Sequence, residues 1–175
     1  GTLVQETSFP WDGRVRIAVE EASGKEFSVF VRVPAWARGA AVRVNARPGD
    51  GPAPVAAPGT FCEIRRAWNS GDVIEIDLPM PVRMVEANPY VEEARNHVAV
   101  VRGPVVYCLE SVDLPEGVRV MDVAIPRDAK LEPRASGELR GATVIEGKGL
   151  AVAGGAWPAG QLYRESTNPP IATAD

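Results

Sequence analysis

Alternating apolar and polar residues dominate the first half of the chain and predict β-strands with one buried face. Segment 14–20 shows this most clearly, because every second residue from Val15 to Val19 is apolar and most of the others are charged. An earlier strand is predicted at residues 3–8, joined to this one by a turn at 9–13. The other predicted inward-facing positions are Phe27, Val29, Val31, Val33, Val42, Val44, Cys62, Ile64, Ile74, Ile76 and Leu78.

The longest apolar run extends from Asn96 to Ser111 and is interrupted once, by Arg102, Gly103 and Pro104. A strand with one wet face alternates, whereas a strand covered on both faces is apolar throughout. Proline cannot donate to a sheet ladder, so Pro104 marks the bend between two such strands. The run predicts a hairpin covered on both faces, and the layer that covers one face need not be part of this chain.

The alternation of apolar and polar residues is weaker after this run. Strands are predicted over residues 118–125, 142–145 and 150–153, with a turn at 146–149 that joins the last two. The tail beyond Tyr163 is polar and is expected to fray. No stretch carries a helical period of useful length.

Two stretches without a strand pattern divide the chain. Residues 46–59 are rich in Pro, Gly and Ala and predict a surface loop. Residues 86–95 are polar and predict a joint between two lobes. The predicted fold is therefore all-β: an antiparallel, jelly-roll-like β-sandwich of two packed β lobes, spanning residues 1–87 and 88–175.

Composition narrows the class of protein. The 175 residues are 45% hydrophobic, enough to bury a core without disulfides or a structural metal. The net charge is −4 with scattered basic residues, which argues against a nucleic-acid partner. No apolar run approaches the roughly 20 residues of a membrane span, and no secretory signal is visible, so we expect no membrane contact and a cytoplasmic location. Because the chain begins at Gly1 without methionine, we expect a processed product or a piece of a longer protein.

Candidate catalytic acids lie on the polar segment. Glu86, Glu92 and Glu93 could supply the paired carboxylates that glycoside hydrolysis needs, with His97 beside them. Neighbouring acids on a polar segment more often form a solvated face, and we favour that interpretation. An independent enzyme that gathers these residues in a cleft is the weaker alternative.

The cysteines offer little chemistry. Cys108 and His97 could form a thiol–imidazole couple, but Cys108 lies within an apolar strand, so we expect it to be buried and inert. Cys62 and Cys108 are far apart in sequence, and whether they pair stays open. Two cysteines and one histidine in this order match no zinc spacing. We assign no catalytic residue, cofactor-binding residue or metal ligand to this chain.

Three tryptophans each lie next to a predicted turn: Trp11, Trp36 and Trp68. Their rings could stack on sugars, as in a carbohydrate-binding module. Tryptophans beside turns more often close the open end of a sandwich, and we expect these three to be largely buried there.

Four motifs, taken together and in order, resemble one enzyme family. They are residues 30–37 (FVRVPAWA), 68–72 (WNSGD), 78–83 (LPMPVR) and 98–110 (VAVVRGPVVYCLE). In this order they resemble the C-terminal region of glycoside hydrolase family 127, the β-L-arabinofuranosidase group.

The resemblance implies a protein with an α/α barrel followed by β-sandwich domains. In this family the barrel holds the active site, with a zinc-bound cysteine nucleophile and a glutamate acid/base, so no catalytic residue is carried over to this chain. We expect a non-catalytic β-sandwich region that supports a catalytic barrel absent from this chain, binding no cofactor itself, with zinc in the barrel. Expected partners are that barrel and a second copy in a homodimer. The alternative is a carbohydrate-binding module that uses exposed tryptophans.

Overall fold

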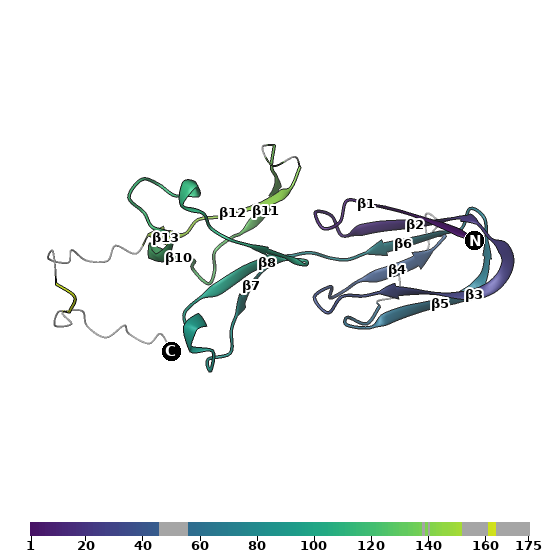
Figure 1. The fold of residues 1–175 in the computed structure, drawn as a ribbon, viewed down its shortest axis with the longest axis horizontal. Coiled ribbons are helices and arrows are strands. Elements are labelled where there is room, and N and C mark those ends of the chain that lie inside the picture. Colours follow the sequence, from purple (N-terminus) through teal and green to yellow (C-terminus); the bar gives the residue numbers. More distant parts are fainter. Residues whose placement is uncertain (46–55, 138, 140, 152–160, 164–175) are drawn as a thin grey trace. The chain divides into compact units, whose positions relative to one another are not determined.

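The computed structural model describes residues 1–45, 56–137, 139, 141–151 and 161–163 (Figure 1). The strands are β1 (Thr2–Thr7), β2 (Arg14–Glu21), β3 (Ser23–Arg32), β4 (Ala41–Val44), β5 (Phe61–Asn69), β6 (Val73–Asp77), β7 (Val82–Glu86), β8 (Val98–Arg102), β9 (Val105–Tyr107), β10 (Val123–Ala124), β11 (Glu132–Ala135), β12 (Thr143–Glu146) and β13 (Leu150–Ala151). Helical structure in these ranges is limited to three 3-10 turns: η1 (Glu92–Ala94), η2 (Ser111–Asp113) and η3 (Val120–Asp122). The all-β prediction is confirmed.

The first six strands form a β-sandwich. One layer is a four-stranded sheet in the order β1-β2-β6-β4, and the other pairs β3 with β5 (Figure 1). All these pairings are antiparallel. Because side chains alternate between the two faces of a strand, this arrangement turns one apolar set from each sheet toward the other.

Most of the predicted inward-facing residues lie in the sandwich core or pack against it, but the prediction is wrong for Phe27, which is 39% exposed. Buried apolar side chains from both sheets and their connections are Val19, Val31, Val33, Ala37, Ala40, Val42, Ala56, Trp68, Ile74, Ile76 and Leu78. Trp68 is the largest of them and is fully buried. Its indole Nε1 donates to the backbone oxygen of Phe27 at 3.0 Å, so the polar atom of the ring is paired as burial requires.

Asp72 stabilises the turn between β5 and β6 and is itself buried. One carboxylate oxygen accepts from the Asn69 amide at 2.9 Å, and the other accepts from Asn45 Nδ2 at 2.7 Å. These hydrogen bonds, the backbone one first, lower the pKa of Asp72, and Arg66, 3.6 Å away, adds to the effect. The turn at residues 69–72 is thus fixed by a side chain within it.

The central apolar run forms a hairpin. Strands β8 and β9 pair around a two-residue turn at Gly103 and Pro104, and β7 pairs with the other edge of β8. The sheet order is β7-β8-β9. The predicted bend at Pro104 is confirmed.

The remaining strands differ from the prediction. Strand β12 pairs with β11, which alternation did not predict, and β13 pairs with β10, so the predicted hairpin between residues 142–145 and 150–153 is wrong. The turn that closes β11 onto β12 is instead made by Ser136, whose amide donates to the Ala142 oxygen at 2.8 Å. A single strand over 118–125 is also wrong, although its last part forms β10.

A local ion pair explains the second difference. Arg119 Nη2 lies 2.7 Å from Asp122 Oδ1, three residues along the chain, and this contact closes the 3-10 turn η3. Parts of the predictions for loop 46–59 and strand 150–153, and the prediction for the tail beyond Tyr163, lie outside the described residues.

Contacts divide the chain into two compact units. One contains residues 1–108 and 130–147, and the other contains residues 109–129 and 148–175. In the described part of the chain, no helix has the length and apolar character needed to cross a bilayer.

Candidate functional site

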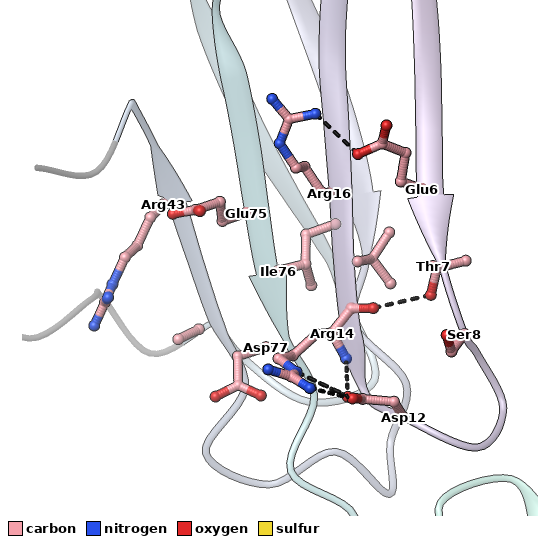
Figure 2. A pocket seen from close by; sticks show the side chains of 12 residues that line it. Glu6, Thr7, Ser8, Asp12, Arg14, Arg16, Arg43, Glu75, Ile76 and Asp77 are labelled. Carbon is pink, nitrogen blue, oxygen red and sulfur yellow. Dashed lines mark hydrogen bonds and ion pairs between the residues drawn. The ribbon is translucent and has the colours of Figure 1, made fainter.

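An open pocket of about 560 Å³ lies on the outer face of the four-stranded sheet (Figure 2). Its lining residues are Glu6, Thr7, Ser8, Asp12, Arg14, Val15, Arg16, Ala41, Arg43, Glu75, Ile76 and Asp77. Strand pairing places Arg16 between Glu6 and Glu75. Arg43 lies opposite Glu75 on the next strand. We call Glu6, Arg16, Glu75 and Arg43 the charged row, because charge alternates in sign from strand to strand.

Two ion pairs lie among the residues that line this pocket. Arg16 Nη1 lies 3.0 Å from Glu6 Oε2, and Arg14 Nη2 lies 2.6 Å from Asp12 Oδ2. The hydrogen bonds from Arg14 hold the pKa of Asp12 below its usual value. A carboxyl with a lowered pKa is ionised at neutral pH and has no proton to donate. The geometry is that of cross-strand pairs on a solvated sheet, not of an acid/base centre.

The candidate acids on the polar segment lie away from this pocket. Glu86 ends β7, and Glu92 and Glu93 lie in η1. His97 Nδ1 lies 2.8 Å from the backbone oxygen of Arg95. All four candidate side chains are exposed, and none lines the pocket. The structure therefore does not bring them together there.

Both cysteines are free thiols. Cys62 is partly buried against the sandwich core, as the alternating pattern of its strand predicted. The expectation that Cys108 is buried is wrong, because β9 ends at Tyr107 and Cys108 is exposed. In the described ranges, no three His, Cys, Asp or Glu side chains gather as metal ligands. This part of the chain therefore does not fit the zinc site that the family resemblance implies.

The three tryptophans occupy different environments. Trp68 is fully buried, as predicted, and Trp36 is half-buried, with its ring stacked on Phe9 at a centroid distance of 6.4 Å. Trp11 is 39% exposed, so the expectation that all three are buried is wrong for Trp11. Only Trp11 and Trp36 therefore offer ring surface to a ligand.

The turn of the β8–β9 hairpin contacts the residues around these two tryptophans. Arg102 Nη1 donates to the backbone oxygen of Trp11 at 2.9 Å. Gly103 has φ +56°, and a Cβ at this position would overlap Met80 Sδ and lie 3.5 Å from Trp36. Glycine is required here both for its backbone conformation and for the close approach. Sequence reasoning recognised the turn but not this contact, since alternation carries no information on which loop a hairpin meets.

One face of the sheet β7-β8-β9 is apolar and exposed. Strand pairing brings Val85 opposite Ala99 and Val101 opposite Val106 on this face. Val85 is 43% exposed, Val106 is 68% exposed, Ala99 is exposed and Val101 is half-buried. We call Val85, Ala99, Val101 and Val106 the aliphatic face. The charged residue that alternates onto it is Arg83, on β7.

Comparison with known families covers most of the chain. Residues 2–80 match the family model described as beta-L-arabinofuranosidase, GH127 middle domain. Residues 82–158 match the model described as glycoside hydrolase family 127 C-terminal domain. The two matches follow one another with a single residue between them.

Individual proteins show the same similarity. A non-reducing end beta-L-arabinofuranosidase from Bifidobacterium longum subsp. longum is 37% identical over 145 residues, which cover 74% of this chain and 21% of that protein. A solved structure of a glycoside hydrolase is 42% identical, with a TM-score of 0.79, over 93% of this chain and 26% of its own. A GH127 beta-L-arabinofuranosidase from Geobacillus stearothermophilus T6 is 40% identical, also with a TM-score of 0.79, over 94% of this chain and 25% of its own. The chain thus corresponds to about a quarter of the length of these relatives.

Proposed function

Because this chain belongs to glycoside hydrolase family 127 through its middle and C-terminal domains, we propose that it supports the catalytic domain of a β-L-arabinofuranosidase. The chain is a non-catalytic region of such an enzyme, since it matches the two domain models over residues 2–80 and 82–158. That match is the observation on which the proposal rests. The catalytic α/α barrel and its zinc belong to the part of the parent enzyme outside this chain.

The geometry of the described residues agrees with a supporting role. The sandwich has a continuous core centred on Trp68, and the β8–β9 turn is fitted closely against Met80. Such packing gives a rigid body, because a close-packed interior resists deformation. A rigid body beside a barrel restricts the movement of whatever it contacts.

The test compares the chain alone with the parent enzyme. Retaining hydrolysis needs a nucleophile and an acid on opposite sides of the sugar. We therefore expect the isolated chain to leave an aryl β-L-arabinofuranoside intact and to contain no stoichiometric zinc by elemental analysis, while the parent hydrolyses it. A parent truncated before this region should unfold at a lower temperature. Turnover by the isolated chain that disappears in Cys108→Ser would contradict the proposal.

A second candidate function is carbohydrate binding by the loop between β1 and β2. The observation in its favour is that Phe9 and Trp11 are both about 40% exposed on this loop. Exposed aromatic rings stack on sugars, whereas the fully buried Trp68 faces protein. Affinity electrophoresis in arabinan gels tests it: Trp11→Ala should abolish retardation if the loop binds sugar. The control is Phe30→Ala, which removes an exposed ring 59% accessible on another sheet.

A further inference from the structure

The aliphatic face of the sheet β7-β8-β9 differs from every expectation for a sheet face in water. Four of the five residues on this side of the sheet are apolar and three of those four are exposed, while the fifth is Arg83, opposite Val101. A solvated face of an antiparallel sheet normally carries polar side chains. The opposite face of the same sheet includes Val82, Met84, Val100 and Val105, which are half-buried. Both faces are therefore rich in apolar residues, although Arg102 and Tyr107 also lie on the second, and within the described ranges the first face is the more exposed of the two.

Cys108 adds an independent observation. Cysteine is among the residue types most often found buried, yet Cys108 is exposed here, two residues after Val106. Cys108 follows directly after β9, next to the edge of this sheet. An exposed thiol close in the chain to exposed valines indicates that the described residues leave this region uncovered.

We propose that the aliphatic face is buried in the parent enzyme against an apolar surface of the domain that lies outside this chain. The inference rests on the proposed function and adds the contact surface to it. Its first support is length: the solved relatives are about four times as long as the region this chain matches, so most of their residues lie outside it.

The chemistry of the aliphatic face also favours a domain of the parent enzyme as its partner. A sugar site needs aromatic planes and convergent polar groups, whereas this side of the sheet has four aliphatic residues and one charged residue, Arg83. Permanent interfaces are the most apolar class of protein contact and have few charges at their centre. The aliphatic face has this composition, with its charged neighbour Arg83 on β7, the edge strand. A permanent contact within one polypeptide accounts for these features.

The experiment uses Cys108 as the reporter in the full-length parent enzyme and in this chain alone. Both are treated with a maleimide, and labelling of the peptide that contains Cys108 is followed by mass spectrometry. We expect labelling in the parent to be at least about tenfold slower, because a covered thiol reacts only when the contact opens locally. Equal labelling rates in the two proteins would overturn the proposal.

Two variants of the parent test the face itself. Val106→Asp should restore fast labelling of Cys108, and so should Val85→Asp on a different strand. The matched control is Val112→Asp, since Val112 is 83% exposed and lies in η2, outside the face. Near-UV circular dichroism checks that each variant is folded. Protection that persists in both folded face variants contradicts the proposal.

Remaining outcomes separate this inference from its premise. If Cys108 in the isolated chain becomes protected as concentration rises, with a dimer by light scattering, the occupant is a second copy and the proposal is wrong. If Cys108 is unprotected in the parent but truncation still lowers the unfolding temperature, the supporting function holds and only this contact surface is refuted.

Discussion

Two exposed sheet faces of this chain have opposite chemistry. On the four-stranded sheet, the charged row alternates in sign from strand to strand, and Arg16 pairs with Glu6 at 3.0 Å. On the sheet β7-β8-β9, the aliphatic face presents valines and an alanine. The first face is adapted to water, because it carries charged side chains, and the two that form an ion pair, Arg16 and Glu6, are both solvated. The second is the face for which we propose a contact with another domain of the parent enzyme.

The hydrogen bonding of buried polar atoms also differs between the two regions. In the described part of the chain, two buried side-chain atoms have no hydrogen-bond partner, Arg102 Nε and the Tyr107 hydroxyl. Both belong to the β8–β9 hairpin, whereas the buried Asp72 and Trp68 of the sandwich are paired. Buried polar atoms in complete folds are nearly always paired. Among the described residues, the unpaired buried side-chain atoms therefore belong to the hairpin and not to the sandwich.

The largest expected effect concerns the sandwich. Trp68→Ala removes the biggest fully buried side chain and its hydrogen bond to Phe27. We expect the free energy of unfolding to fall by about 3–5 kcal/mol, the usual result of truncating a buried aromatic residue. Urea unfolding followed by far-UV circular dichroism measures it. Trp11→Ala is the control, since Trp11 is partly exposed. Equal losses in the two variants would show that the sandwich does not depend on its own core.

A smaller effect is expected where the hairpin turn meets the sandwich residues. Gly103→Ala places a methyl group against Met80 at a backbone conformation that alanine disfavours. Overpacking of this kind destabilises by about 1–3 kcal/mol. The control Gly117→Ala also has positive φ, but nothing lies within 4 Å of its Cβ position. The difference between the two variants in urea unfolding isolates the steric part. No difference would mean that the contact with Met80 adjusts freely.

The sandwich was predictable from sequence because its strands are long and have one wet face. Segment 14–20 alternates, and β2 spans Arg14–Glu21. The two-residue strands β10 and β13 are too short to show a period, and β11 contains Pro133, which breaks the strand pattern. Alternation identifies the face of a side chain, but pairing depends on where distant segments meet.

The sequence also could not predict which surfaces of the chain are covered by other protein segments. The apolar run around Val106 correctly predicted a hairpin, but the predicted cover on both faces is not present among the described residues, because Val85 and Val106 are exposed. It could not predict that Cys108 is exposed, because periodicity does not show which chain provides the cover. The exposure of Trp11 was missed for a similar reason: its surroundings depend on Arg102, 91 residues away.

The contribution of Asp72 to the stability of the sandwich should depend on pH. Its pKa is lowered in the folded state, so its contribution is present above the unfolded value near 3.8 and is lost as pH falls through the folded pKa. We expect Asp72→Asn to lower the free energy of unfolding by about 1–2 kcal/mol at pH 7, the scale of hydrogen bonds to a charged group. The deficit should shrink below pH 4. Urea titrations at several pH values measure both quantities, and a deficit that does not depend on pH contradicts the assigned role.

The smallest effect is expected from the charged row itself. Arg16→Ala removes an ion pair whose side chains are 47% and 64% exposed, so water already solvates both charges. We expect a loss below about 1 kcal/mol, decreasing further in high salt, because exposed pairs are weak and screened. The matched variant Val106→Asp, in the isolated chain, should also change stability little, yet in the parent it should expose Cys108. Unfolding free energies at low and high salt make the measurement. If Arg16→Ala destabilised the chain as much as Trp68→Ala, the charged row would belong to a buried contact, and the distinction between the two faces would fail.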